Sequence, residues 1–181
     1  MGSAASSGNT PAQIRGDDWI MHKKAHGTSA APVQSCLRWG CSSELADQIC
    51  NFNRHGAERK NYWRKSTDFA ATLRRADAEG KESLDFFDSN TGRLLFRAPR
   101  GRTYSQFMAE SKAHGWPSFR TQEVNWGRVR VLDTGEVVSI DGTHLGHAFG
   151  DRFCINLVSI AGQPGCGDRG GERQQHGRGL L

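Results

Sequence analysis

The sequence contains no long hydrophobic run, and this absence excludes several classes of protein. No apolar stretch approaches the roughly 20 residues that a helix needs to span a bilayer. The N-terminal region also lacks the apolar core of a signal peptide, because Asp17, Asp18, Lys23 and Lys24 interrupt it. We therefore expect a protein that is neither secreted nor membrane-spanning and that resides in the cytoplasm.

The sequence also lacks any Cys-x-x-Cys pair. Its five cysteines are odd in number and irregular in spacing, which fits no disulfide scaffold. Cys36, Cys41 and Cys50 are spaced poorly for the tetrahedral ligand set of a structural zinc site. We therefore predict no zinc and no other bound cofactor. Cys50 is expected on the inner face of a helix, and Cys41 just before that helix.

Glycine is distributed unevenly along the 181 residues. Of the 22 glycines, four lie in residues 1–35 and six in residues 163–181. The first flank is otherwise rich in Ser and Ala, and the last in Arg and Gln. The chain as a whole is polar, with 36% hydrophobic residues and a mean hydropathy of −0.64. Both flanks are therefore predicted to be disordered, while residues 36–162 have a normal length for one small, monomeric domain.

Hydrophobic periodicity predicts helices before strands. Apolar residues recur at helical spacing, with Ser or Thr at the start of each segment, in residues 44–57, 67–78 and 104–112. Short apolar runs between turn residues predict strands at 84–87, 93–96, 128–132, 136–140, 145–149 and 153–160. This order predicts an α+β, mainly β domain at residues 83–162, preceded by a helical N-terminal extension at residues 36–82.

The last predicted hairpin places a histidine beside a cysteine. Gly150-Asp151 is typical of a two-residue loop in which glycine supplies the positive φ of a type II′ turn. In that register His147 pairs with Cys154, with Cβ atoms about 4.5–5.5 Å apart, and Arg152 shares their face. A nearby cation lowers the pKa of a thiol, as a cysteine nucleophile requires. The alternative is a half-buried strand cysteine that has a histidine neighbour by chance.

Three motifs occur in the order found in a known family: GWPSF at residues 115–119, HLGHAF at 144–149 and RFCIN at 152–156. They resemble the GWPSF, HLGHVF and R-[YF]-C-[IV]-N blocks of methionine sulfoxide reductase B, the SelR-domain family. The resemblance covers residues 83–162 and implies a twisted antiparallel β-sheet domain, SelR-like or Mss4-like. It also implies thiol-dependent, stereospecific reduction of methionine-R-sulfoxide, free or in proteins, and so repair of oxidative damage.

The resemblance implies roles for individual residues. Cys154 aligns with the nucleophile that attacks the sulfoxide sulfur and becomes a sulfenic acid. Arg152 matches the residue that favours the thiolate, and His147 matches the acid that protonates the sulfoxide oxygen. The supporting polar network is matched by His144, Asp151 and Asn156, and the substrate-binding residues by Trp116 and Phe119.

Two departures from the family bear on activity. The resolving cysteine that commonly precedes GWPSF is absent, since residues 110–114 read ESKAH. The sulfenic acid would then be reduced directly by a thioredoxin-like or other thiol donor, or by Cys166 as a resolving cysteine. The alternative interpretation of Cys166 is a tail cysteine without a role in the reaction. The family's loop between Asp151 and Arg152 is also missing. This deletion would either open the site to bulky protein substrates or leave an inactive binding or scaffold module. A cysteine hydrolase is disfavoured because no oxyanion-hole motif is apparent.

Two surface features suggest partners. Basic residues cluster in segments 54–65 and 93–102, but no nucleic-acid-binding motif accompanies them and the net charge is only +5, so we expect no nucleic-acid partner. The expected partners are oxidised proteins or methionine sulfoxide, and a thioredoxin-like reductant.

The first six residues, MGSAAS, fit the N-myristoylation pattern, with Gly2 as the acceptor. The alternative is an ordinary disordered N-terminus. A single myristoyl chain would give only weak, reversible membrane contact.

Overall fold

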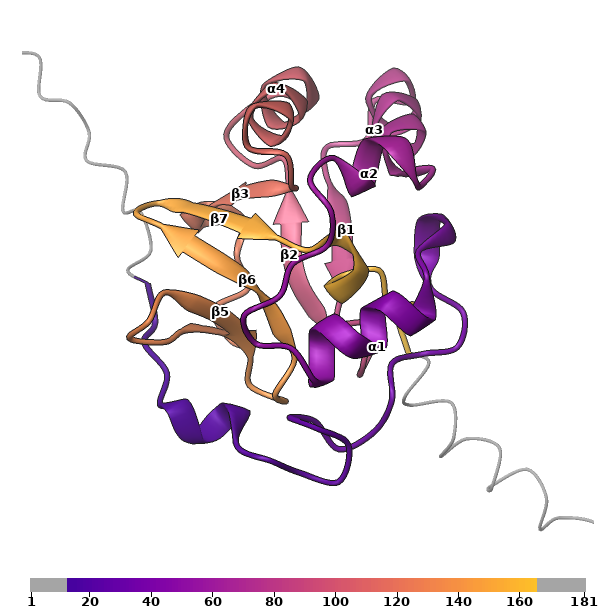
Figure 1. Cartoon of the computed structure of the whole chain (residues 1–181). Coiled ribbons are helices and arrows are strands. Elements are labelled where there is room, and N and C mark those ends of the chain that lie inside the picture. The colour runs from indigo at the N-terminus through magenta and orange to yellow at the C-terminus, as the bar shows by residue number, and fades with distance from the viewer. Residues whose placement is uncertain (1–12, 166–181) are drawn as a thin grey trace, which may run out of the picture.

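The computed structural model describes residues 13–165 and arranges them around a curled antiparallel sheet (Figure 1). Five strands form this sheet, in the spatial order β3 (Ser118–Arg120), β7 (Arg152–Ile155), β6 (His144–Phe149), β5 (Glu136–Ser139) and β4 (Val129–Val131). A separate hairpin pairs β1 (Leu84–Phe87) with β2 (Leu94–Ala98). The fold is α+β with mostly antiparallel strands, as the sequence predicts.

The helices precede or flank the sheet. They are α1 (Ser43–Asn51), α2 (Tyr62–Lys65), α3 (Phe69–Ala78) and α4 (Tyr104–His114), with 3₁₀ turns at Asp18–Met21 (η1), Arg38–Gly40 (η2), Thr121–Glu123 (η3) and Leu157–Ser159 (η4). Thr103 and Gln106 form a capping box that begins α4, and Gly115 ends it with a φ of 96°. In Figure 1, α3 stands beside α4 at one end of the molecule, while α1 packs against β6 and η4.

Two predicted boundaries differ clearly from the structure, and one strand is not predicted by the sequence. The first predicted helix ends at Asn51 rather than at residue 57, which frees residues 53–57 to form a loop over the sheet. The last predicted strand stops at Ile155, because the chain turns into η4 after Asn156, whose amide and backbone N–H both donate to the Leu145 carbonyl. Strand β3 is only three residues long and has no periodic pattern of its own.

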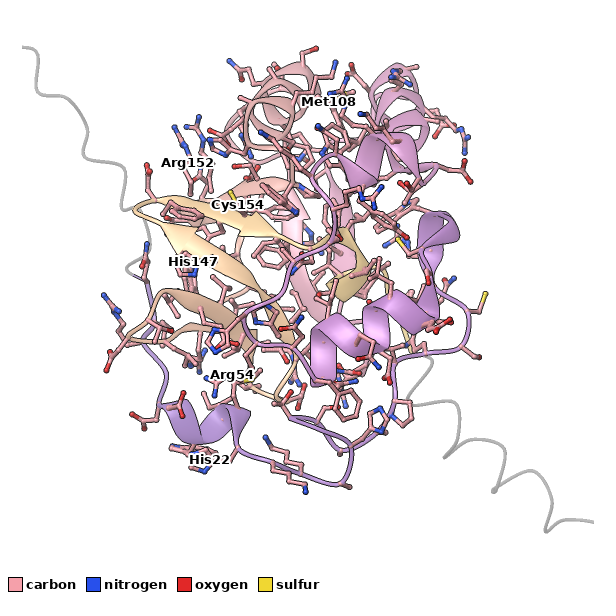
Figure 2. All side chains as sticks on the ribbon, in the orientation of Figure 1. His22, Arg54, Met108, His147, Arg152 and Cys154 are labelled. Atoms are coloured by element: carbon pink, nitrogen blue, oxygen red, sulfur yellow. The ribbon has the colours of Figure 1, made fainter. Side chains whose placement is uncertain are left out.

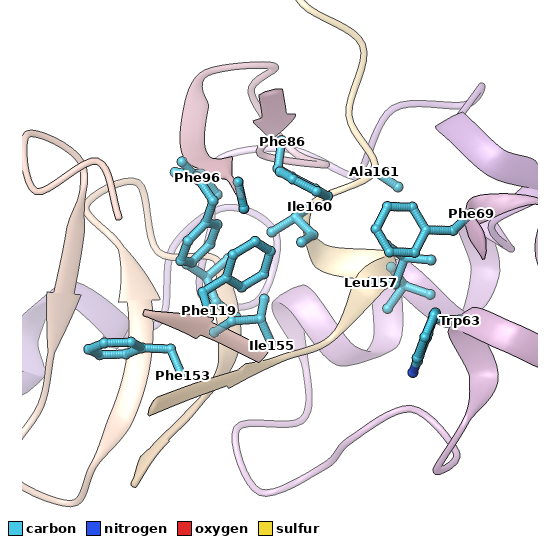
Figure 3. Close-up of a cluster of buried hydrophobic side chains, with 14 of the residues drawn as sticks. Trp63, Phe69, Phe86, Phe96, Phe119, Phe153, Ile155, Leu157, Ile160 and Ala161 are labelled. Carbon is cyan, nitrogen blue, oxygen red and sulfur yellow. The ribbon is translucent and has the colours of Figure 1, made fainter. Parts of the chain in front are cut away.

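One hydrophobic core joins the helical extension to the sheet (Figure 3). Phe119 stacks on Phe96 with ring centroids 4.3 Å apart and meets Phe86 edge-on at 5.1 Å. Phe86 in turn contacts Phe69 of α3 at 5.7 Å, and Phe69 contacts Trp63 of α2 at 6.1 Å. Residues 36–82 and 83–162 therefore share one core instead of burying two separate ones.

Residues 13–35 pack on the sheet, which corrects the prediction that the whole segment 1–35 is disordered. Ile14 and Gly16 exchange backbone hydrogen bonds of 3.0 Å with Val131, at the edge of β4. Ile20 and Met21 are buried in a second small cluster with Leu132 and Val138. Averaging composition over the segment hides these few apolar residues.

Two predicted features lie outside the described residues. The myristoylation acceptor Gly2 belongs to residues 1–12, and the candidate resolving Cys166 to residues 166–181. Within residues 13–165, no helix combines the length and the apolar character needed to cross a membrane.

Candidate active site around Cys154

The β6–β7 hairpin has the register that its turn residues predict. His147 pairs with Cys154, Ala148 with Phe153, and Phe149 with Arg152. Gly150 adopts a φ of 61° in the two-residue loop, a conformation that glycine reaches without steric cost. The backbone thus fixes Cys154 and His147 as direct cross-strand neighbours.

Cys154 lies between two strands, because β3 pairs with the other side of β7 and places Ser118 opposite Cys154. Since side chains alternate along a strand, Ser118, Cys154 and His147 share one face of the sheet. The other face carries Phe119 and Phe153, which are fully buried in the core. Phe119, matched to substrate binding by the family motif, is therefore a core residue here and does not line the site.

Five of the sequence-predicted residues line one open pocket of about 300 Å³: Cys154, His147, His144, Asn156 and Trp116. Figure 2 shows Cys154 and His147 on the neighbouring strands β7 and β6. Cys154 is half-buried, whereas His147 and the adjacent Phe149 are exposed, with their rings 4.8 Å apart. The pocket combines a thiol, imidazoles, an amide and an indole.

The opposite wall of the pocket comes from the helical extension. Residues 54–57, in the loop after α1, line it, a contribution that the sequence does not predict. Three predicted site residues hold this loop. His144 Nε2 lies 3.2 Å from the Gly56 carbonyl oxygen. Asn156 Oδ1 accepts a hydrogen bond from the Glu58 N–H at 2.9 Å, and the Trp116 indole donates one to the Glu58 carbonyl at 3.0 Å. Although the loop that the resemblance implies between Asp151 and Arg152 is absent, residues 54–57 give the pocket a second wall.

A chain of charged groups fixes the same loop from below the pocket. Arg54 donates to buried Glu136 at 2.8 Å and to Asp18 at 2.6 Å, and His144 Nδ1 lies 2.7 Å from Glu136. Burial alone would raise the pKa of Glu136, but the hydrogen bonds from His144 and Arg54 outweigh it and lower that pKa. Glu136 is therefore ionised and holds Arg54 and His144 by hydrogen bonds. Arg54 is labelled in Figure 2.

No family model, no curated protein and no solved structure matches this chain. The three motifs remain a resemblance, and the chemistry of the site follows from its own side chains.

Arg152 does not act on the thiol as the sequence predicts. Its Nε lies 2.8 Å from Glu110 of α4, and the same carboxylate pairs with Arg102 at 2.6 Å and Arg120 at 3.2 Å. Burial and the negative charge of Glu110 raise the pKa of the Cys154 thiol. The expectation that Arg152 lowers this pKa is wrong, because its charge is engaged by a carboxylate that also faces the sulfur.

A second histidine reaches the sulfur from α4. His114 Nδ1 lies 3.7 Å from Cys154 Sγ and 2.9 Å from the hydroxyl oxygen of Ser118. His114 is not among the residues predicted from the sequence, although its position directly before Gly115, at the start of the GWPSF motif, is a signal that could have identified it. Thus Cys154 has one histidine across the strand pair and another at a helix end.

The remaining candidates lie away from the pocket. Asp151 sits in the hairpin loop with its side chain 77% exposed. Cys36 is exposed, while Cys41 and Cys50 are buried before and within α1, as predicted, and burial raises the pKa of both thiols. Among residues 13–165, no three His, Cys, Asp or Glu side chains are grouped so as to hold a metal ion.

Proposed function

We propose that the chain is a thiol-dependent reductase of methionine-R-sulfoxide, free or within proteins, with Cys154 as its nucleophile. The observation that carries the proposal is the meeting of Cys154, His147 and Trp116 in one open pocket. Its volume of about 300 Å³ lies at the small end of ligand sites, which suits one side chain better than a large cofactor. The proposal includes a SelR-like sheet, a cytoplasmic location and no bound cofactor.

The proposed reaction transfers one oxygen atom. The Cys154 thiolate attacks the sulfoxide sulfur, and His147 donates a proton to the sulfoxide oxygen, on which negative charge develops. The attack forms a bond between Sγ and the methionine sulfur. This bond and the bond between the methionine sulfur and oxygen then break as the protonated oxygen moves to Sγ and forms the new bond there. The methionine sulfur is reduced by two electrons, and Cys154 is oxidised to a sulfenic acid.

The remaining side chains bind and orient the substrate. The indole of Trp116, held by its hydrogen bond to the Glu58 carbonyl, offers an apolar surface to the substrate methyl group. His147 is exposed and therefore exchanges protons with solvent between turnovers. His144 and Asn156 fix the loop at residues 56–58 and so keep the pocket open beside the thiol.

An external dithiol completes the cycle in this proposal. A first donor thiol attacks the sulfenic acid, releases water and forms a mixed disulfide with Cys154, which the second thiol then breaks. Within residues 13–165, Cys154 is the single cysteine of the pocket lining. A thioredoxin-like protein fits this role, and comparing it with a small dithiol in a Cys166→Ser variant tests the tail cysteine.

The test is an epimer-specific assay. The protein is incubated with the R or the S form of methionine sulfoxide and a dithiol, and methionine is quantified. We expect turnover of the R form only, lost in Cys154→Ser and retained in Cys36→Ser, which removes an exposed thiol outside the pocket. Absence of turnover by the folded protein would contradict the proposal.

A catalytically silent binding or scaffold module is the second candidate, and one observation favours it. The raised pKa of the Cys154 thiol keeps most of it protonated at neutral pH, where a nucleophile is needed as thiolate. The two candidates differ in whether the site holds a group that removes this proton.

A further inference from the structure

A histidine contacts Cys154 from the end of α4. His114 is the last residue of this helix, and Gly115 closes the helix in the left-handed region, with a φ of 96°. This helix end brings the imidazole over the β3–β7 strand pair, where Nδ1 lies 3.7 Å from Sγ. Such a separation is within the range of a hydrogen bond to sulfur.

The imidazole is fixed there by Ser118. The Ser118 hydroxyl oxygen lies 2.9 Å from His114 Nδ1 and 3.3 Å from the Glu110 carboxylate, and Ser118 pairs with Cys154 across the strands. Burial would raise the pKa of Glu110, but the hydrogen bond from Arg102 and the charges of Arg102, Arg120 and Arg152 lower it. Glu110 is therefore a carboxylate. The Ser118 hydroxyl has one hydrogen, which it donates to Nδ1 when that nitrogen carries no proton and to Glu110 when it does. In both states Ser118 lies beside Nδ1 and keeps that side of the ring toward the sulfur.

The two histidines are in different positions to act. His147 is exposed, packs against Phe149 and lies next to Gly135, where it is open to solvent. His114 is partly buried and contacts the sulfur itself. A group that removes the thiol proton must contact the thiol, whereas a group that protonates a substrate oxygen must face the pocket.

We propose that His114 is a catalytic base that takes the proton of Cys154. With the ring proton on Nε2, the Sγ–H bond breaks, its electron pair stays on sulfur as the thiolate, and the proton moves to Nδ1. The Ser118 hydroxyl hydrogen turns from Nδ1 to Glu110 in the same step. The imidazolium that forms faces the new thiolate and, through Ser118, the Glu110 carboxylate. The proton on His114 and the one that His147 gives to the substrate are rebalanced through solvent. Proton removal itself concerns the free protein; its use in sulfoxide reduction rests on the proposed function.

The test measures the reactivity of Cys154 without any sulfoxide. Iodoacetamide alkylation of Cys154 is followed by mass spectrometry of its own peptide from pH 5.5 to 9.5, since exposed Cys36 reacts as well. The wild-type rate is expected to rise in a step well below the reference thiol value of about 8.5, because a base in contact with the thiol removes its proton. In His114→Asn, which keeps a polar atom near the position of Nδ1 but takes up no proton, we expect at least a tenfold lower rate at pH 7. The rate should recover only near pH 9.

Several charged or titratable groups lie around the sulfur, the ring and Glu110, and some of them define the other variants. They come from α4, β3, β6, β7 and the loops around the pocket: Glu110, Arg120, His147, Arg152, His55 and Lys60. His147→Asn should leave this low-pH step in the alkylation profile, which assigns the step to His114. His22→Gln, at an exposed histidine in the N-terminal segment, should leave the profile unchanged.

The outcomes separate the two proposals. Equal alkylation rates in wild type and His114→Asn across the pH range overturn the role of His114. A wild-type profile with a single step at or above the reference thiol value of about 8.5 also overturns it, even if the variants do not fold. A low-pH step that disappears in His114→Asn, in a protein that reduces neither sulfoxide epimer, supports the base and contradicts the reductase instead.

Discussion

Glu58 is a carboxylic acid buried directly behind the pocket. It is 2% exposed, its Oε1 accepts from the Val158 N–H at 3.0 Å, and its Oε2 has no hydrogen-bond partner. Burial raises its pKa to about 8, although backbone hydrogen bonds oppose the shift. Its backbone holds both Trp116 and Asn156. At neutral pH the side chain is therefore mostly an uncharged acid under the pocket wall.

We expect Glu58→Gln to remove a pH dependence of stability. Unfolded glutamate has a pKa of about 4.3, so folding raises the value, and the stability this provides is full below pH 4 and lost as pH rises to about 8. The free energy of unfolding of wild type relative to Glu58→Gln should fall by about 1.4 kcal/mol per pH unit in this window. Urea unfolding at several pH values measures it.

The matched control is Glu79→Gln, because Glu79 is an exposed glutamate at the end of α3. Its difference from wild type should not vary in this way between pH 5 and 8. A flat difference for Glu58→Gln as well would show that Glu58 is ionised in the folded protein.

The β6–β7 hairpin is the element that sets the spacing of Cys154 and His147. Gly150 has a φ of 61°, and a Cβ added there meets no atom within 4 Å. Any cost of a side chain at this position is therefore a backbone cost. The hairpin depends on one glycine for its two-residue loop.

Replacing this glycine should weaken the hairpin without crowding it. Gly150→Ala is expected to lower the free energy of unfolding by about 1–2 kcal/mol, the usual cost of a left-handed conformation for an L-residue. Gly150→Asn should lose less, because asparagine tolerates positive φ better. Denaturant unfolding of both variants checks the order, and an alanine variant as stable as wild type would contradict it.

Local patterns predicted the parts of the site that depend on neighbouring residues. The Gly150-Asp151 turn was sufficient to pair His147 with Cys154, because a two-residue loop leaves one register. His114 lies 40 residues from Cys154, and its contact depends on how α4 meets β3. Residues 54–57, which form the other wall, are still more distant from Cys154 in the sequence. Such contacts follow from packing between elements, which no local period encodes.

Charge pairing explains why the sequence predicts the wrong effect of Arg152 on the pKa of the Cys154 thiol. On β7 it shares the face of Cys154, as the alternation of a strand predicts. Its effect on the thiol depends on Glu110, which α4 brings to 2.8 Å from its Nε. Neither the burial of the thiol nor this carboxylate is evident from the sequence, and together they raise the pKa of Cys154 instead of lowering it.

At the scale of the molecule, the N-terminal segment closes one side of the sheet. Met21 is 3% exposed and packs with Ile20, Leu132 and Val138 in a cluster separate from the main core. Arg54 connects the same segment to the pocket wall through Asp18. The segment therefore contributes to stability and contacts the support of the site.

Met21→Ala tests this packing. Truncating a buried methionine costs about 2–5 kcal/mol, and the small cluster predicts the low end of this range. Trp19→Ala removes a larger side chain that is 63% exposed and should change the free energy of unfolding by less than about 0.5 kcal/mol. Urea denaturation of both variants distinguishes a packed segment from one that only lies on the surface, for which the two losses would be similar.

Because the loop at residues 54–58 forms part of the pocket, the shortest chain that can form this pocket is longer than the segment that contains the three motifs. A truncated chain that starts at residue 83 would contain GWPSF, HLGHAF and RFCIN in full. It would nevertheless leave the Trp116 indole and the Asn156 amide facing water in place of Glu58, and Phe86 without Phe69. Any shortened version of this protein that is meant to keep the Cys154 pocket must therefore retain at least residues 54–82 together with the motifs.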